Sequence, residues 1–358
     1  MNNERVVVAM SGGVDSSVTA ALLLERGFEV IGITMRLGSH EAAGHDSGKL
    51  SCCSIESVED ARSVAGQLGI PFYAVNFEAA FKEDVVDYFC QEYSAGRTPN
   101  PCIICNEKLK FGRLLRRAYE LEASYVATGH YARISRDEDT GRYILRKGID
   151  AQKDQSYALF SITQDQLKHI LTPLGDYTKS EVRSIAESLS LKTSQRPESQ
   201  ELCFISDDNY NRFLQERMSH SIKPGPMLDT AGKVVGKHRG IQFYTIGQRK
   251  GLGSFGKPMY VVKVDAPANA IVIGTQDDLL VDRLTASNAN FISIPRLSES
   301  IKVTAKIRYN DPGAWATANP LTDDRFEVIF HHPRRAITPG QAVVMYDGDI
   351  VIGGGWIE

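Results

Sequence analysis

A short glycine-rich segment near the start of the chain has the composition of a phosphate-binding loop. Residues 11–17, Ser-Gly-Gly-Val-Asp-Ser-Ser, follow the apolar run 6–10 and precede the helix-like run 18–26. Glycines let an anion approach the backbone amides, and the N-terminus of a helix adds a partial positive charge. The order strand, turn, helix therefore predicts an anion pocket. The alternative is that the hydroxyl groups only cap an ordinary helix.

Three cysteines are the second set of residues able to do chemistry. Cys102 and Cys105 form a Cys-x-x-Cys pair next to two prolines, and Cys203 lies far along the chain in an apolar run that resembles a strand. We expect Cys105 at or near the N-terminus of a basic helix over residues 107–120, beside Lys108, and both neighbours favour the thiolate. Such thiols serve as nucleophiles or metal ligands. The alternative is a proline-held loop with two incidental thiols.

The composition is that of a globular protein. The chain has 358 residues, 42% of them hydrophobic, and a net charge of −3. Its length exceeds one typical core, so we expect two or three domains. It shows no membrane-spanning stretch and no signal-peptide pattern, so we expect a cytoplasmic protein with no membrane contact. An RNA site would need a local basic surface, and residues 97–117 and 208–260 are basic windows.

The six cysteines do not form a disulfide framework in a chain of this size and compartment. Cys90 lies in the apolar part of a helix expected over residues 81–95, where a buried thiol is the simplest interpretation. Cys52 and Cys53 close the Gly-, Ser- and His-rich stretch 36–54, whose spacing matches no standard zinc pattern. Their role stays open.

Strands and helices alternate through the first half of the chain, which predicts an α/β domain with a doubly wound parallel sheet. We expect a βαβ unit over 5–34, a helix over 55–68, a strand over 72–76 and another strand over 124–131. Met35 and the pair Gly129-His130 fall at the carboxyl ends of strands, where ligands bind in such sheets. Core packing for Met35 and a structural role for His130 are the alternatives.

The second half of the chain has a different pattern. A hairpin over 131–146 and two helices with capping boxes, Thr163 to Gln166 and Thr178 to Glu181, come first. The alternation then fades, and short strands between 260 and 358 predict a small β-barrel. We therefore expect a nucleotide-binding catalytic domain over 1–206, a central domain over 207–263 and a C-terminal β-barrel over 264–358.

Residues 11–17 resemble the PP-loop of ATP pyrophosphatases, and motifs spread over the chain extend this resemblance. Together they are similar to the bacterial tRNA-specific 2-thiouridylase family, of the MnmA/TrmU type. The motifs, in order, are Ser-Gly-Gly-Val-Asp-Ser-Ser (11–17), Gly-Arg-Thr-Pro-Asn-Pro (96–101), Ala-Thr-Gly-His-Tyr (127–131), Lys-Asp-Gln-Ser-Tyr (153–157), Leu-Cys-Phe-Ile (202–205), Thr-Ile-Gly-Gln-Arg-Lys-Gly-Leu-Gly (245–253) and Thr-Pro-Gly-Gln (338–341).

The resemblance implies an ATP-dependent tRNA-uridine 2-sulfurtransferase. Such an enzyme adenylates the C2 oxygen of uridine 34 in the tRNAs for lysine, glutamate and glutamine. Sulfur from a persulfide then gives 2-thiouridine, AMP and pyrophosphate. The implied cofactors are ATP and Mg²⁺, and the implied partners are tRNA and a cysteine desulfurase or another persulfide donor protein.

The resemblance also assigns roles to residues of this chain. Cys105 is the implied nucleophile, and Cys203 is the implied persulfide carrier that ends in a disulfide with it. The implied ATP-binding residues are Ala9, Met10, Ser11, Gly12, Gly13, Val14, Asp15, Ser16, Met35 and Gly129. The implied tRNA-binding residues are Asn100, Pro101, Cys102, His130, Lys153, Asp154, Gln155, Arg308, Tyr309 and Gln341, of which residues 100–102 meet the target base.

One position departs from the family pattern. Many members have an aspartate, proposed as an acid/base group, where this chain has Cys102. Cys102, Cys105 and Cys203 could instead hold three corners of a [4Fe–4S] cluster whose fourth iron binds sulfide. We favour the persulfide route, because a Cys-x-x-Cys pair with one distant cysteine does not identify a cluster.

Two further hypotheses remain open. Another adenylating ligase with a PP-loop would need no paired thiols, so Cys203→Ser would leave it active. A tRNA-binding module with a vestigial ATPase site would bind RNA but form no thiouridine.

Overall fold

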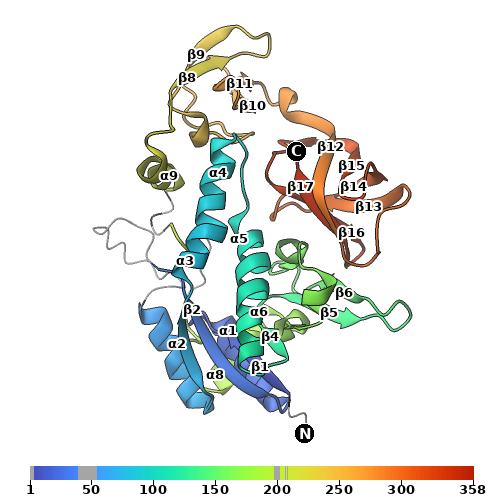
Figure 1. The fold of residues 1–358 in the computed structure, drawn as a ribbon. Coiled ribbons are helices and arrows are strands. Elements are labelled where there is room, and N and C mark those ends of the chain that lie inside the picture. Colours follow the sequence, from blue (N-terminus) through green and yellow to red (C-terminus); the bar gives the residue numbers. More distant parts are fainter. Residues whose placement is uncertain (1–3, 39–54, 197–201, 206, 208) are drawn as a thin grey trace. The chain divides into compact units, whose positions relative to one another are not determined.

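The computed structural model describes residues 4–38, 55–196, 202–205, 207 and 209–358 (Figure 1). The chain divides into two compact units, each assembled from several stretches of sequence. The first unit consists of Met1–Val85, Cys102–Asn209 and Asp349–Val351. The second unit consists of Val86–Pro101, Tyr210–Gly348 and Ile352–Glu358.

A five-stranded parallel sheet is the framework of the first unit. Its order is β3-β2-β1-β4-β7, and each neighbouring pair runs parallel. The strands are β1 (Arg5–Ala9), β2 (Glu29–Arg36), β3 (Phe72–Asn76), β4 (Tyr125–Ala127) and β7 (Ile170–Leu171). The chain moves outward from β1 to β3 and then crosses back to β4, so the order reverses between β1 and β4. Ligands of doubly wound sheets bind at such a reversal, beyond the carboxyl ends of the strands.

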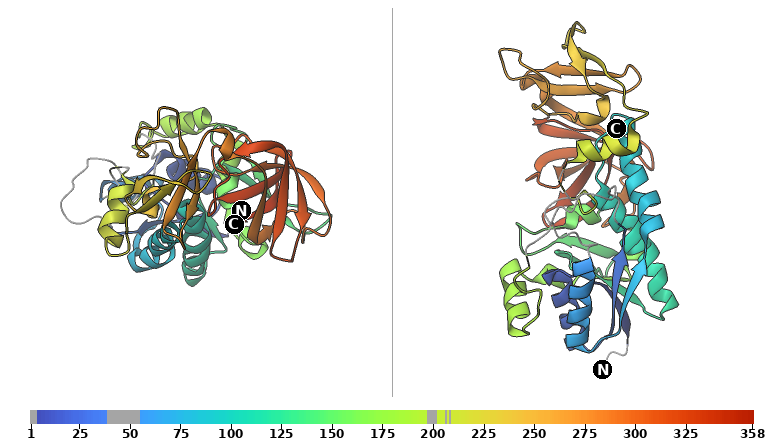
Figure 2. Two further views of the ribbon diagram at one scale, coloured as in Figure 1. Left: turned by 90° about the horizontal axis from the view of Figure 1, so that it is seen from above. Right: turned by 90° about the vertical axis from the view of Figure 1, so that its left-hand side faces the viewer.

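Helices cover both faces of this sheet. Figure 2 (right) shows α8 on one side of the blue strands and the teal helices that include α6 on the other. The helical elements are α1 (Val14–Glu25), α2 (Ile55–Leu68), α3 (Glu78–Phe81), η1 (Lys82–Asp87), α5 (Pro101–Ile104), η2 (Cys105–Arg113), α6 (Leu114–Glu120), η3 (Ser156–Leu159), α7 (Gln164–Leu167), η4 (Pro173–Asp176) and α8 (Lys179–Ser188). The doubly wound sheet predicted from the sequence is confirmed.

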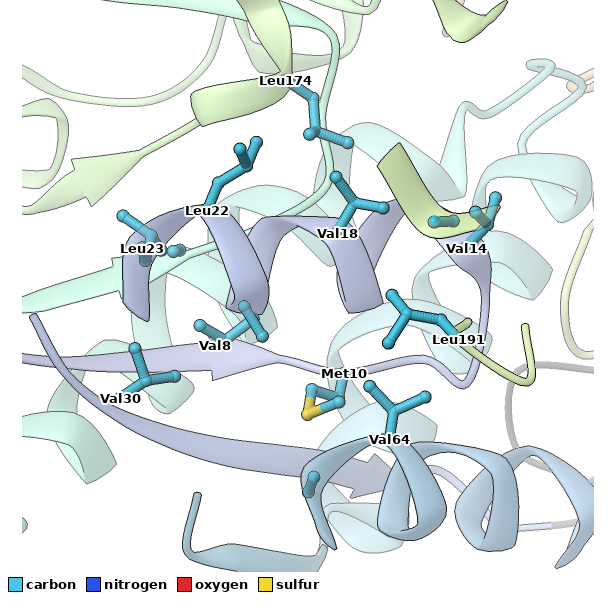
Figure 3. Packing of buried hydrophobic residues seen from close by; sticks show 14 of the residues in the cluster. Val8, Met10, Val14, Val18, Leu22, Leu23, Val30, Val64, Leu174 and Leu191 are labelled. Carbon is cyan, nitrogen blue, oxygen red and sulfur yellow. The ribbon is translucent and has the colours of Figure 1, made fainter. Parts of the chain in front are cut away.

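A hydrophobic core of the first unit lies between the sheet and α1, α2 and α8. Figure 3 shows α1 lying along β1, with Val18 and Leu22 directed toward Leu174, and Met10 close to Val64 of α2. Val8 and Val18 are fully buried. This packing fixes the angle at which α1 leaves the loop after β1.

Most local predictions in this unit are confirmed, and two are wrong. The helix 55–68, the strand 72–76 and both capping boxes occur as expected. The basic helix starts at Pro101 rather than at 107, because proline is favoured in the first turn, where its missing N–H costs nothing. The apolar run around Cys203 is not a strand, since Ile205 N donates to Leu202 O in a turn (3.0 Å).

The hairpin β5 (Ala132–Arg136) and β6 (Tyr143–Lys147) completes the first unit. The segment Asp349–Val351 lies against it, with Ile350 paired to Arg146. Asp349 also forms ion pairs with Arg133 (2.7 Å) and Arg146 (3.1 Å).

The second unit contains a four-stranded sheet and a closed antiparallel barrel (Figure 1). The sheet, in the order β10-β11-β8-β9, is made of β8 (Gly225–Leu228), β9 (Val234–His238), β10 (Tyr260–Asp265) and β11 (Ala270–Gly274). The barrel is made of β12 (Leu280–Phe291), β13 (Ile301–Lys306), β14 (Ala314–Pro320), β15 (Phe326–Arg335), β16 (Ala342–Asp347) and β17 (Ile350–Ile357). Pairing of β12 with β17 closes it around its own apolar core.

The predicted C-terminal barrel is thus confirmed, although its strand content differs from the expectation. The strands near 260 and 270 are β10 and β11, which pair with each other, and β11 pairs with β8, so both belong to the four-stranded sheet and not to the barrel. Two barrel strands, β12 and β14, were not predicted from the sequence. The proposed domain limits after residues 206 and 263 stay predictions.

The helical elements of the second unit are α4 (Tyr88–Ser94), α9 (Tyr210–Met218), η5 (Ile241–Phe243) and η6 (Asp277–Leu279). Within the described part of the chain, no helix is both long and apolar enough to span a bilayer.

Candidate functional site

The loop between β1 and α1 has the geometry of an anion pocket. Gly13 is the N-cap of α1 in an extended conformation, and no side chain caps the helix there. The Ser16 and Ser17 hydroxyls both donate to Gly13 O (3.1 and 2.9 Å), and Ser11 N donates to Ser16 Oγ (3.1 Å). The serines therefore stabilise the loop itself rather than only capping a helix. The amides of the first turn of α1 are left for a ligand.

Two glycines allow close approaches around this loop. Gly12 has φ +73°, and a Cβ there would lie 2.2 Å from Ser57 O. A Cβ on Gly129, which follows β4, would lie 2.8 Å from Asp15 Cβ and 3.0 Å from Ser16 N. The predicted pocket residue Gly129 thus lies directly against the first turn of α1, at the reversal of the sheet.

A lysine that the loop sequence lacks comes from α8. Lys179 Nζ contacts both carboxylate oxygens of Asp15, at 2.7 and 2.8 Å, and Tyr131 donates its hydroxyl to the same carboxylate at 2.7 Å. The Lys179 side chain is only 11% exposed, while that of Asp15 is 32% exposed. A cation is therefore held at the phosphate loop. Its one sequence signal is the capping box that begins α8 at Thr178.

Arg196 is a second residue that sequence analysis did not single out. Its guanidinium donates to Gly12 O (2.8 Å) and to Ser57 Oγ (2.8 Å), and it forms an ion pair with Asp60. Arg196 therefore ties the phosphate loop to α2 and adds positive charge beside it. A lone arginine after the turns that follow α8 has no sequence signal for this role.

The other predicted nucleotide-binding residues lie on the same strands. Ala9 ends β1, Met10 is buried just after it, and Met35 is half-buried near the end of the neighbouring strand β2. Thr34 Oγ1 donates to Met10 O (2.7 Å), which holds the two strand ends together.

The three cysteines of the predicted chemistry belong to the first unit. Cys102 is exposed in the first turn of α5, Cys105 is half-buried at the start of η2, and Cys203 is half-buried in a turn. The ring of Phe204, next to Cys203, packs against Phe81 of α3 (5.8 Å between centroids), and α3 contacts η2. The turn that contains Cys203 and the π-helix that begins at Cys105 therefore both contact α3.

Buried polar contacts of Asn106, the residue after Cys105, hold this helix in place. Asn106, which is 2% exposed, donates to Ala158 O (2.9 Å) and accepts from Lys110 Nζ (2.9 Å). Cys105 opens a π-helical segment, a geometry that is frequent at functional sites.

The described residues do not include a ligand set for a single metal ion. Within the described ranges, no group of three or more His, Cys, Asp or Glu side chains is arranged to hold a metal ion. The cluster alternative for Cys102, Cys105 and Cys203 stays a prediction, because each of these cysteines would bind a different iron rather than share one ion. His40, His45, Cys52 and Cys53 lie outside the described residues.

Comparison with known proteins gives a consistent match over the chain. Family models described as a tRNA methyl transferase HUP domain, a tRNA methyl transferase PRC-barrel domain and an aminomethyltransferase β-barrel domain match residues 4–207, 211–275 and 281–357. A tRNA-specific 2-thiouridylase of Thermoanaerobacter sp. (strain X514) is 54% identical, covering 99% of this chain and 98% of the relative. One of Acetivibrio thermocellus is 51% identical over the full length of both. The chain belongs to the tRNA-specific 2-thiouridylase family.

Several solved structures that match the chain are only distantly similar to it. A 4-thiouridine synthetase in complex with RNA and ATP, for example, is 16% identical with a TM-score of 0.34, covering 61% of this chain and 51% of that one.

Some residues predicted to contact tRNA in this thiouridylase form internal bonds. His130 is buried, its Nδ1 is 2.7 Å from Thr128 Oγ1, and its ring lies near Phe111 of η2. Burial, with the nearby charge of Lys110 as a smaller cause, holds the pKa of His130 well below its usual value. His130 is therefore a buried, neutral histidine next to the Cys105 helix, and its contact with tRNA stays a prediction.

The segment of Lys153, Asp154 and Gln155 also bonds inward. Asp154 accepts from Gly148 N (3.2 Å) and Ser156 N (3.0 Å), and Gln155 Oε1 accepts from Tyr131 N (3.0 Å). Because Tyr131 also binds Asp15, this segment is linked to the phosphate loop through one tyrosine.

In the second unit, Gln341 supports the segment that leads to the predicted base-contacting residues. Its Nε2 donates to Thr98 O (2.9 Å) and Pro99 O (3.3 Å), directly before Asn100 and Pro101. Arg308 and Tyr309, in contrast, lie exposed in the loop between β13 and β14, as expected of residues that meet a partner.

Proposed function

We propose that this thiouridylase uses ATP to replace the C2 oxygen of uridine 34 by sulfur in the tRNAs for lysine, glutamate and glutamine. The observation that supports the proposal is the presence of three parts in one unit. A phosphate loop with a largely buried lysine lies at the reversal of the sheet, and the Cys105 helix and the Cys203 turn each contact α3. Loop and thiols supply the two halves of a sulfur transfer.

Activation of the uracil is the first half. The C2 carbonyl oxygen attacks the α-phosphorus of MgATP, the new P–O bond forms, and the bond to pyrophosphate breaks. The amides of the Ser11–Ser16 loop, the start of α1 and Lys179 stabilise the negative charge on the phosphates. AMP bound to C2 is then a good leaving group, which the bare carbonyl oxygen is not.

Sulfur transfer is the second half. The terminal sulfur of a Cys203 persulfide attacks C2, and the C2–O bond breaks as AMP leaves. The Cys105 thiolate attacks the Cys203 sulfur and breaks the S–S bond, leaving C2=S and a Cys105–Cys203 disulfide. The transferred sulfur is reduced and the two thiols are oxidised. A dithiol reductant and a persulfide donor protein, such as a cysteine desulfurase, restore the enzyme for the next cycle.

The cysteine roles are tested by reconstitution with a tRNA transcript, MgATP, a persulfide donor and a dithiol. Nucleoside mass spectrometry of the product distinguishes sulfur replacing oxygen from an added methyl group, the reaction that the family-model description names. We expect 2-thiouridine from the wild type, none from Cys105→Ser or Cys203→Ser, and an unchanged yield from Cys90→Ser. Cys90→Ser is the matched control because Cys90, in α4, takes no part in the proposed chemistry.

Pyrophosphate release separates the alternatives. We expect both cysteine variants to release pyrophosphate in the presence of tRNA, because adenylation does not use the thiols. Thiouridine formed by Cys203→Ser would contradict the persulfide route. Protein purified without oxygen that contains iron, and that loses activity on Cys102→Ser and on iron removal, would instead favour the cluster route.

A further inference from the structure

A large aromatic side chain is exposed on the outer face of the barrel. Trp315 of β14 is 63% exposed, while its neighbour Ala316 and the next inward residue, Ala318, are fully buried in the barrel core. Side chains alternate along a strand, so Trp315 points outward. Nothing in the barrel core requires a tryptophan at this position.

Basic side chains flank this tryptophan on the adjacent strand. In the β13–β14 pairing Trp315 is opposite Thr304, so the diagonal positions on the same face are Lys302 and Lys306. Lys302 is exposed and Lys306 half-buried. Diagonal neighbours on one face of a sheet are within reach of long side chains, about 7–8 Å apart.

The loop of the same hairpin adds an exposed arginine and an exposed tyrosine, and its backbone is held by hydrogen bonds to Asp311. Arg308 and Tyr309 are exposed, whereas Asp311 is 2% exposed and accepts from Ile307 N and Gly313 N, each at 3.0 Å. Asp311 also pairs with Arg334. Its charge is thereby buried and compensated, so the exposed charges of hairpin residues 301–320 are all positive.

We propose that the outer face of the β13–β14 hairpin, formed by Lys302, Thr304, Lys306 and Trp315 with Arg308 and Tyr309 of its loop, binds tRNA, and that Trp315 stacks on an unpaired base. This inference rests on the proposed function for the identity of the RNA. It adds an aromatic platform and two lysines to the loop residues already predicted to contact tRNA.

The chemistry of the face favours RNA over a protein partner. Phosphates pair with the lysines and the arginine, and a base can stack on an indole whatever its sequence. Tryptophan also has the strongest aromatic face for cation and π contacts. An exposed indole between lysines therefore fits a single-stranded stretch of nucleic acid. The indole can stack on a base while the lysines pair with the phosphates on either side of it.

The test compares tRNA binding by the full-length wild type, Trp315→Ala and Trp315→Tyr, measured by fluorescence anisotropy with a labelled tRNA transcript at fixed salt. Loss of one stacked base costs about 1–3 kcal/mol, so we expect Trp315→Ala to weaken binding about 5- to 150-fold. Trp315→Tyr retains most of the affinity because it keeps a ring. Leu321→Ala is the matched control, since Leu321 is also exposed (52%) just beyond the far end of β14.

Two further readouts make the test specific for stacking. Tryptophan fluorescence of the wild type is quenched by unlabelled tRNA, and the quenched component is absent in Trp315→Ala. Lys302→Ala with Lys306→Ala reduces the salt dependence of binding. Equal melting temperatures of all variants confirm that the barrel is intact.

Unchanged tRNA affinity of Trp315→Ala, in a preparation whose wild type binds tRNA and forms 2-thiouridine, would overturn the inference and leave the proposed function standing. The same would hold if Trp315→Ala bound tRNA normally but accepted sulfur poorly from the donor protein, which would assign the face to that protein. A wild type that neither binds tRNA nor forms 2-thiouridine would instead overturn the proposed function.

Discussion

The carboxylate of Asp15 connects the phosphate loop to the elements around it. It joins three elements: its own helix α1, the Tyr131 hydroxyl after β4, and Lys179 of α8. A carboxylate that faces bound phosphates would repel them, but here it positions an ammonium group at the loop. We infer that Lys179 supplies to this loop, which has no lysine in its own sequence, a positive charge for a polyphosphate.

Lys179→Met tests this role. We expect a free energy of unfolding lower by about 1–3 kcal/mol, because Asp15 keeps a charge that has lost its cation in a partly buried site. We also expect ATP to bind at least tenfold more weakly, measured by titration calorimetry. Lys179→Arg keeps the positive charge, so it should lose less stability and less ATP affinity than Lys179→Met.

The double variant Asp15→Asn with Lys179→Met separates stability from binding. Removing both charges should recover most of the stability, since no unpaired ion remains, yet ATP affinity should stay low. If ATP affinity returned together with stability, Lys179 would be a structural residue only.

Glu107 gives a second prediction about a single residue. Burial raises its pKa above the ordinary value of a glutamate. A raised folded-state pKa contributes stability below the unfolded pKa, which is lost as pH rises through the folded value. The ionised group is therefore costly at neutral pH. We expect Glu107→Gln to melt at a higher temperature at pH 7 and at the same temperature as the wild type near pH 4. The exposed Glu138→Gln should show no such difference.

Packing between elements decides which glycines can be replaced. Gly129→Ala would place a methyl group against Asp15 and the amide of Ser16 at distances of 2.8–3.0 Å, so the first turn of α1 would have to shift. We expect a loss of about 1–3 kcal/mol in unfolding free energy and a large loss of ATP affinity. Gly66→Ala is the control, because nothing lies within 4 Å of its added Cβ in the last turn of α2.

The two alanine variants should change stability in opposite directions. Gly66→Ala should stabilise by about 0.5–1 kcal/mol, the usual gain of alanine over glycine in a helix, with ATP binding unchanged. Chemical denaturation measures both. Equal effects of the two substitutions would show that α1 does not pack on Gly129 in solution.

Elements with strong local signals were predictable from the sequence. Periodicity placed α2 and β3, and capping boxes placed α7 and α8, because these signals act within a few residues. The sequence pattern places the strands near 260 and 270 in the barrel, whereas they form a separate sheet in which β10 pairs with β11 and β11 with β8, because partner choice depends on the whole fold and not on the strand alone. Two prolines before the Cys105 helix predict a later helix start, whereas Pro101 occupies the first turn of α5.

The candidate site was predictable only where its residues are close in sequence. The loop 11–17 and the Cys-x-x-Cys pair are local patterns. Lys179 reaches Asp15 across 164 positions, and Arg196 reaches Gly12 across 184. Such partners are determined by the reversal of the sheet and the packing of α8 on α1, which no local pattern contains.

At the scale of the whole molecule, each of the two units contains a histidine that burial keeps neutral. Burial lowers the pKa of His130 in the first unit and, as the larger of two causes, that of His238 in the second. His238 Nε2 bonds to Asn269 O at 2.9 Å, and its Nδ1 accepts from Gly240 N at 3.1 Å. Protonation would break the second bond, because the protonated ring has no acceptor.

Acid should therefore destabilise both units. With the folded pKa depressed, the unfolded chain takes up the proton first, so stability is complete above the unfolded pKa of about 6.5 and falls as pH drops below it. We expect each histidine to lower the free energy of unfolding by up to about 1.4 kcal/mol for each pH unit that the pH falls between 6.5 and the histidine's own folded pKa. Hydrogen exchange of peptides from β4 and from β9 reports on the two units separately.

Substitution of each histidine should act on its own unit alone. His130→Gln should flatten the acid dependence of exchange in the β4 peptides and leave that of the β9 peptides unchanged, and His238→Gln should do the reverse. The exposed His332→Gln should alter neither. Because the two histidines belong to separate cores, their effects should add. If His130→Gln changed the acid response of both sets of peptides, the two units would unfold as one cooperative body, and acid sensitivity would be a property of the whole chain rather than of each core.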